Sequence, residues 1–209
     1  MVAALCAIAS NVVPSAGVSA EATYGTNLVV NGDAEAGPGA ASSSEIKPPP
    51  GWTSTGQFTA VKYGASGGFP DATSPSPADR GANFFAGGNV VLSSGSQTIR
   101  LDALAADIDT GTVKYAFSAW LGGFSNQDDN ATVTVTFRSK TGGNTGHAQL
   151  GPVLSAERKA VTGFLSKQAV GTVPKGTRSA VVTITCRRLA GTYNDGEADD
   201  VSLILDKAP

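Results

Sequence analysis

The sequence contains few of the residues that catalytic and metal centres use most. Its 209 residues include two cysteines and one histidine. A Ser-His-Asp triad would have to use His147, and no nucleophile-elbow sequence accompanies that residue. A zinc site would need more His and Cys ligands than the chain offers. The sequence therefore favours neither a serine hydrolase nor a zinc enzyme.

The sequence also lacks an excess of basic residues. Fifteen Lys and Arg stand against seventeen Asp and Glu, and the formal net charge is -2. Nucleic-acid binding needs basic residues that neutralise phosphates, so no nucleic-acid partner is expected. The one long uncharged stretch, residues 1–20, is interrupted by Asn11 and Pro14 and is too short to predict a membrane span.

Residues 1–20 resemble a secretion signal. They contain an apolar run and end in small residues that suit cleavage after Ala20. The basic segment that usually opens such a signal is missing, so either the start codon lies further upstream or the signal is a poor one. Cleavage would leave Cys186 as the only cysteine, which excludes an internal disulfide. We expect a secreted, extracellular protein with a flexible lead-in at 21–26 and a single domain at 27–206.

Apolar and polar residues alternate with period two through several segments, namely 112–121, 131–138, 179–187 and 197–205. The 26 glycines and 11 prolines fall between such runs, as turns do in β-proteins. Residues 102–111 have helical spacing and predict at most one short helix. Alternation in successive strands predicts antiparallel sheets, each with one buried face. We therefore predict an all-β, antiparallel β-sandwich.

The outward residues of these strands predict a ligand-binding surface. If the strands share a sheet, Trp120, Arg138 and Arg187 stand among threonines that include Thr136 and Thr185. An indole beside planar polar groups suits the apolar face and the hydroxyls of a sugar ring. The alternative is that a loop covers Trp120 and that the threonines are simply good strand residues.

Three loops add further candidates. Tyr193 is the single aromatic residue of a polar loop, 191–196, whose composition also occurs in loops that contact ligands. Loop 124–130 is rich in oxygen ligands that suit a second cation or a sugar, although such a run is usually a solvated turn. Loop 64–81 has no periodic pattern, and loops of this length are often functional or mobile.

Acidic turns lie near both ends of the predicted domain. Asp33 and Glu35 follow a short apolar strand at 27–30, and Asp199 and Asp200 open the last predicted strand. We expect the two ends to meet in one sheet around a cation, because carboxylates supply the oxygen ligands that hard cations prefer. The alternative is that these acids cap turns in water.

Three motifs connect the sequence to a known group of proteins. They are the Asn-Gly-Asp-x-Glu turn at 31–35, the strand around Trp120 and the Asp-Asp-Val run at 199–201. With them the chain resembles the galactose-binding-like jelly-roll superfamily, especially bacterial extracellular carbohydrate-binding modules of families 4, 9 and 22. Ala34 stands where that group commonly has an aromatic residue, a change that leaves the acidic ligands in place.

The resemblance implies a jelly-roll sandwich with one structural calcium ion and no catalytic activity. The implied ligands are Glu35 and Asp199, nearby backbone carbonyls, and Asp33 or Asp200. The expected function is non-catalytic binding of a poly- or oligosaccharide. Two alternatives stay open: an extracellular structural domain with a protein partner, and a small polysaccharide-active enzyme, whose acid pair the sequence does not single out.

Overall fold

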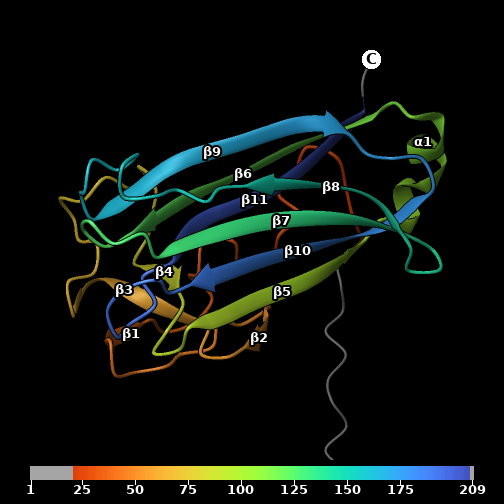
Figure 1. Cartoon of the computed structure of the whole chain (residues 1–209). Coiled ribbons are helices and arrows are strands. Elements are labelled where there is room, and N and C mark those ends of the chain that lie inside the picture. The colour runs from red at the N-terminus through yellow and green to blue at the C-terminus, as the bar shows by residue number, and fades with distance from the viewer. Residues whose placement is uncertain (1–20, 208–209) are drawn as a thin grey trace, which may run out of the picture.

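Two β-sheets form most of the protein in the computed structural model, which describes residues 21–207 (Figure 1). The first sheet has six strands in the order β1-β3-β4-β11-β6-β9, and the second has five in the order β2-β5-β10-β7-β8. The predicted all-β sandwich is confirmed. The predicted signal at residues 1–20 lies outside the described residues.

The strands are long at the centre of each sheet and short at one edge. The six-stranded sheet contains β1 (Ala40–Ser42), β3 (Thr59–Ser66), β4 (Asn83–Ala86), β6 (Val113–Gly123), β9 (Gly163–Thr172) and β11 (Glu197–Lys207). The five-stranded sheet contains β2 (Thr53–Thr55), β5 (Leu92–Arg100), β7 (Asn130–Ser139), β8 (Asn144–Leu150) and β10 (Thr177–Arg187). The pairing of β1 with β3 is parallel, whereas the other strand pairs of the described chain are antiparallel.

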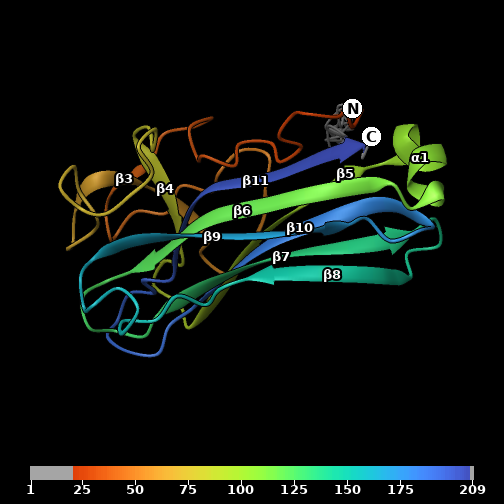
Figure 2. The same ribbon diagram turned by 90° about the horizontal axis from the view of Figure 1, so that it is seen from above.

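Among residues 21–207, the helical content is one short segment after β5, as predicted for residues 102–111. A 3-10 turn (Asp102–Leu104) leads into α1 (Ala105–Thr110). Gly111 ends this helix with φ +82°, a left-handed conformation that favours glycine. Figure 2 shows α1 at one end of the molecule and β3 and β4 at the other. No helix within residues 21–207 is long and apolar enough to cross a membrane.

The main core lies between the two sheets and consists of the inward residues that the alternation predicts. Phe117 of β6 and Leu203 of β11 meet Val135 of β7 and Ile184 of β10, and all four are buried. Burial of a side chain of this size stabilises the fold by roughly 1.5–3 kcal/mol. The regular strands are therefore held by their apolar faces.

A second, smaller cluster of aromatic residues packs on the outer face of the six-stranded sheet. Phe84 and Phe164 are fully buried there, with ring centroids 5.6 Å apart in an edge-to-face arrangement. Tyr63 and Phe69 pack against the same phenylalanine, Phe84. Because Phe69 lies in the long loop between β3 and β4, this loop folds back over one end of the sheet.

The two ends of the domain meet, as predicted, but residues 27–30 form one isolated bridge and then a bend and a turn rather than a strand. An isolated bridge joins Asn27 to Ile204 of β11. The side chain of Asn27 completes the contact: its Oδ1 accepts from the Leu203 N–H at 3.0 Å, and its Nδ2 donates to the Val201 carbonyl at 3.2 Å. The side-chain amide of Asn27 thus forms hydrogen bonds with β11 that the backbone of a paired strand would otherwise form.

The expected flexible lead-in at 21–26 packs against the domain. Ala22 is buried in the main core, and the Tyr24 hydroxyl donates to the Asp107 carboxylate at 3.0 Å. The N–H of Gly25 donates to the carbonyl of Leu205 at 3.0 Å. The packed domain therefore begins near Ala22 rather than at residue 27.

Candidate functional site

The predicted binding residues lie on two different sheets. Trp120 belongs to β6 of the six-stranded sheet. Thr136 and Arg138 lie on β7, and Thr185 and Arg187 lie on β10, both in the five-stranded sheet. Because the sheets bury their inner faces against each other, their outward residues lie on opposite surfaces of the sandwich. The predicted single surface of tryptophan, threonines and arginines is therefore wrong.

The two arginines are also far from each other. Arg138 pairs with Ser179 in the register of β7 and β10, whereas Arg187 pairs with Asn130. Eight residues of β10 separate these two rows, which corresponds to about 26 Å at the rise of a β-strand. The two guanidinium groups stand near opposite ends of the sheet and do not converge on one small ligand.

Tyr193 is a packing residue rather than the surface contact expected from its loop. Only 8% of its surface is exposed, and its ring makes an edge-to-face contact with Phe69 at 5.0 Å. It belongs to the aromatic cluster on the outer face of the six-stranded sheet. Its polar sequence neighbours gave no sign of this burial.

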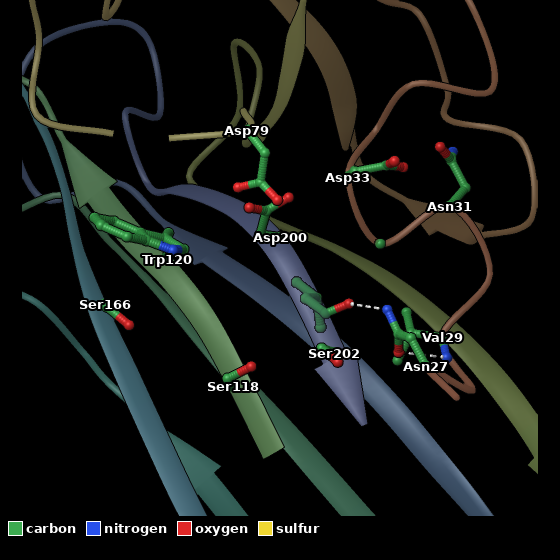
Figure 3. A pocket seen from close by; sticks show the side chains of 12 residues that line it. Asn27, Val29, Asn31, Asp33, Asp79, Ser118, Trp120, Ser166, Asp200 and Ser202 are labelled. Atoms are coloured by element: carbon green, nitrogen blue, oxygen red, sulfur yellow. Dashed lines mark hydrogen bonds between the residues drawn. The ribbon is translucent and has the colours of Figure 1, made fainter. Parts of the chain in front are cut away.

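Trp120 lines a cavity of about 420 Å³ on the outer face of the six-stranded sheet, here called the Trp120 cavity (Figure 3). Strand register forms its floor: Trp120 of β6 pairs with Ser166 of β9, and Ser118 of β6 pairs with Ser202 of β11. The walls come from residues 27–33 and from the loop between β3 and β4. An indole and three hydroxyl groups thus stand together on adjacent strands.

A β-bulge in β11 places a carboxylate in this cavity. The register between β11 and β6 shifts between Asp199 and Ser202, and Asp200 has a left-handed φ of +46°. Asp199 pairs with Trp120 and so shares its outer face, whereas Val201 is buried in the main core. The extra residue therefore leaves Asp200 at the outer face as well, where it lines the cavity.

The Trp120 cavity is acidic, because Asp33, Asp79 and Asp200 all line it. Burial, together with the negative charges of Asp79 and Asp33, raises the pKa of Asp200 to about 6. Figure 3 shows the carboxyl groups of Asp79 and Asp200 side by side. No Lys or Arg lines the cavity within the described chain.

The four predicted calcium ligands fall into two groups. Asp33 and Asp200 face the Trp120 cavity. Glu35 reaches instead toward the start of β4, where its Oε1 accepts from the backbone N–H groups of Ala82 and Asn83 at 2.8 and 2.6 Å. The turn at 31–35 therefore sends its two acids in different directions.

Asp199, the fourth predicted calcium ligand, is fully buried. Its Oδ2 accepts from the Tyr63 hydroxyl at 2.7 Å, and its Oδ1 accepts from the N–H of Asp200 at 2.8 Å. Burial raises the pKa of Asp199 to about 8, and the charges of Asp200 and Glu35 act in the same direction. This carboxylate lacks a cationic side-chain partner within 4.0 Å among residues 21–207.

The oxygen atoms around Glu35 are of the chemical types that bind calcium. The Oδ1 of Asn83 is buried without a hydrogen-bond partner, while its Nδ2 donates to the carbonyl of Ala34 at 3.3 Å. Carboxylate, amide and carbonyl oxygens are the ligands that calcium takes in proteins. However, no group of three or more His, Cys, Asp or Glu side chains in residues 21–207 is arranged to hold a metal ion. A calcium ion here would rely on Glu35 and Asp199 together with neutral oxygens.

A separate group of buried charges supports the loops at the start of β7 and β11. Asp129 is fully buried, and its carboxylate accepts from the N–H groups of Leu189, Ala190 and Asp195 at 2.7, 2.8 and 3.1 Å. One side chain thus fixes two points of the segment between β10 and β11. Within loop 124–130, this acid is a structural anchor rather than part of a solvated turn.

Arg158 lies in the same region and binds the neighbouring loop. Its Nη1 donates to the carbonyl of Ser125 at 3.1 Å, and its Nη2 donates to that of Gln127 at 2.9 Å. Both carboxylate oxygens of Glu197 are buried there without a hydrogen-bond partner in the described chain. Burial and the charge of Asp195 raise the pKa of Glu197 well above its ordinary value, whereas Arg158 opposes that shift.

Sequence patterns missed several residues of the Trp120 cavity. Asp79 lies in the long loop between β3 and β4, and the length of that loop was the only signal for it. Ser166 lies on β9, a strand that the alternation did not reveal. Asn27 and Asn31 come from the turns that replace the predicted first strand.

The fold and the cavity define an antiparallel β-sandwich with a polar, indole-lined cavity on one outer face. No protein-family model matches the sequence, and a search of curated proteins found no match. Among solved structures, the enzymatically active domain of tailspike protein 4 of bacteriophage CBA120 is similar, with a TM-score of 0.52, 16% identity and 86% of this chain covered. This chain spans 21% of the length of that chain.

Carbohydrate-binding modules are also among the similar structures. A family 16 carbohydrate-binding module has a TM-score of 0.49 and 21% identity, with 85% of this chain and 99% of that one covered. The CBM22-1 xylan-binding domain of Paenibacillus barcinonensis has a TM-score of 0.44 and 13% identity, with 80% and 92% covered. Modules of families 4 and 35 match as well. Families 4 and 22, which the sequence suggested, are thus among the similar structures, all of which are 21% identical or less.

Proposed function

We propose that this protein is a secreted module that binds a poly- or oligosaccharide in the Trp120 cavity without cleaving it. The observation that carries the proposal is an indole beside hydroxyl, amide and carboxylate groups in a cavity of about 420 Å³. This volume is within the range of about 300–1,000 Å³ for pockets that hold small organic ligands. A sugar ring has an apolar face for the indole and hydroxyl groups that donate to carboxylates.

The surroundings of Trp120 suit a stacking platform. The residue is half-buried and packs against the aromatic cluster that contains Phe84 and Phe164. Packing on one side holds the indole in a single orientation, so little conformational entropy is lost when a ligand binds. Ser166 and Ser118 stand on the neighbouring positions of the floor, where they can exchange hydrogen bonds with sugar hydroxyls.

The two closest carboxylates of the cavity do not have the spacing of a glycosidase pair. The carboxyl groups of Asp79 and Asp200 lie side by side (Figure 3). Glycosidases keep their two carboxyl groups about 5 Å or more apart, on either side of the bond that breaks. We therefore propose binding without hydrolysis. Release of reducing ends from a polysaccharide that the protein retains would contradict this part of the proposal.

Replacing Trp120 with alanine is expected to lower the affinity for the retained polysaccharide about thirtyfold, because a central tryptophan contributes about 2 kcal/mol or more at a binding site. The measurement is affinity electrophoresis of residues 21–209 through gels that each contain one soluble polysaccharide. Arg187→Ala is the matched control, since Arg187 is exposed on the opposite sheet.

The outcomes of this experiment either locate the binding site or contradict the proposal. Retardation that is lost in Trp120→Ala and kept in Arg187→Ala supports the Trp120 cavity. The reverse pattern would move the site to the five-stranded sheet. If no polysaccharide retards the folded protein, the proposal fails, and the same fold is better explained as an extracellular protein-interaction domain.

We further propose one structural calcium ion held by Glu35, Asp199 and neighbouring neutral oxygens. Calcium would neutralise the buried carboxylate of Asp199, whose pKa is raised by burial and by the nearby charges of Asp200 and Glu35. A ligand that binds only the native state, present at a free concentration of about 100 times its Kd, stabilises that state by about 2.7 kcal/mol. Calcium is therefore expected to raise the melting temperature, and a chelator to lower it.

The calcium prediction is checked by thermal melting of the wild type and of Glu35→Gln. Glutamine keeps an oxygen for the N–H groups of Ala82 and Asn83 but removes the charge. The variant should melt at the same temperature with calcium as with chelator. A wild-type melting temperature that does not respond to either addition would count against the calcium site.

A further inference from the structure

The Trp120 cavity carries more negative charge than a neutral sugar requires. Asp33, Asp79 and Asp200 reach it from three separate segments: the first turn, the loop between β3 and β4, and the bulge of β11. None of these carboxylates has a Lys, Arg or His nitrogen within 4.0 Å among residues 21–207. The fold therefore gathers three carboxylates without supplying a cationic side chain.

Such an arrangement has an energetic cost that a ligand can offset. Like charges held close together repel one another, most strongly where the groups are partly withdrawn from water. Asp200 is half-buried and stands directly against Asp79 (Figure 3). A ligand with a positive charge between these two carboxyl groups would remove the repulsion and form charge-assisted hydrogen bonds.

The shape and lining of the cavity favour an organic cation over a bare metal ion. No group of three or more acidic, His or Cys side chains in the described chain is arranged to hold a metal ion. A volume of about 420 Å³ is far larger than one ion needs. The indole of Trp120 adds a surface that attracts cations through its π-electrons and stacks on flat apolar groups.

Resting on the proposed function, we propose that the Trp120 cavity recognises an amino sugar, a glucosamine-type oligosaccharide whose protonated amine lies between the carboxylates of Asp79 and Asp200. The sugar ring stacks on Trp120. The neighbouring hydroxyl groups of the ring face the serines on the floor of the cavity and the side-chain amides of its wall.

The test compares two ligands that differ only at the amine. Isothermal titration calorimetry is performed on residues 21–209 at near-neutral pH, where Asp200 is ionised, and at low salt, with a glucosamine oligomer and with its fully N-acetylated counterpart of equal length. We expect the glucosamine oligomer to bind at least about tenfold more tightly, since each well-formed charge-assisted contact is worth about that factor. The preference should decrease as salt screens the charges.

Two variants locate the charge recognition. Asp79→Asn, which keeps the shape of the side chain, should reduce the preference for the amine to about threefold or less while binding of the N-acetylated oligomer persists. Asp102→Asn removes an acid that does not line the cavity and should leave the preference unchanged. A cationic oligolysine of equal charge should bind more weakly than the glucosamine oligomer, because it lacks a ring to stack on Trp120.

The outcomes separate this inference from the proposed function. If the N-acetylated oligomer or a neutral glycan binds equally well and depends on Trp120, the amino-sugar inference is overturned and the carbohydrate-binding proposal stands. If no sugar binds, both fail. The inference is also overturned if Asp79→Asn keeps the full preference, if oligolysine binds as tightly, or if calcium at low concentration displaces the glucosamine oligomer.

Discussion

Asp129→Ala is expected to destabilise the protein by about 3–5 kcal/mol, which is a large share of the stability of an ordinary domain. The carboxylate of Asp129 accepts three backbone hydrogen bonds, from Leu189, Ala190 and Asp195, and it is fully buried. Alanine would leave three buried N–H groups without an acceptor. It would also release the segment between β10 and β11, which leads into the strand that carries Asp199 and Asp200.

Equilibrium unfolding in urea measures this loss. Asp129→Asn keeps one oxygen acceptor and should cost clearly less than the alanine variant. Asp128→Ala is the matched control, because Asp128 is an exposed neighbour whose side-chain hydrogen bonds go to Ser155 alone, and its replacement should cost far less than that of Asp129. A loss of less than about 1 kcal/mol in Asp129→Ala would show that the three hydrogen bonds are replaced by water.

The free energy of unfolding is expected to fall as the pH rises from about 4 to about 7, because burial and the charge of Asp129 raise the pKa of Asp195 to about 7. The ordinary value of this carboxyl group is 3.8. Between the two values the native state holds a proton that the unfolded state has released, so each rise in pH favours unfolding. The contribution of Asp195 is complete below about pH 4 and is lost by about pH 7, and it amounts to about 4 kcal/mol at most.

The contribution of Asp195 is isolated by comparison with Asp195→Asn, whose side chain is neutral at every pH. Urea unfolding at pH 5 and pH 8, with chelator present, should show a steeper loss of stability in the wild type than in this variant. Glu45→Gln, which removes a partly exposed acid, should keep the wild-type slope. Parallel slopes for the wild type and Asp195→Asn would mean that Asp195 is ionised at both pH values.

The sequence alone determined the fold class and the strongest strands. In β7, apolar and threonine residues alternate from Ala131 to Phe137, and β10 repeats this pattern except at the outward Val181, so one buried face accounts for both strands. The alternation in the sequence did not reveal other strands. β8 is an exposed edge strand with few apolar residues. β9 has Lys167 on its less exposed face and Val170 on its exposed face, so periodicity could not reveal either strand.

The sequence determined the candidate site only in part. Sequence patterns indicated Trp120 as an outward residue and the acidic turns at 31–35 and 199–200 as neighbours, and the structure brings Asp33 and Asp200 into one cavity with Trp120. The structure alone decided that β6 pairs with β11 and β9, so that Trp120 lies on the surface opposite Arg138 and Arg187. Alternation specifies which side chains share a face of a strand, but it contains no information about which strands become neighbours.

The tertiary structure also decided which acids are buried and which face the cavity. Asp128 and Asp129 are adjacent and chemically identical, yet one is exposed and the other is fully buried under three amides. Asp199 and Asp200 share the outer face only because a bulge adds one residue to β11. Burial, strand neighbours and bulges depend on contacts between segments far apart in the chain, and local sequence patterns record only the residues that each segment brings to those contacts.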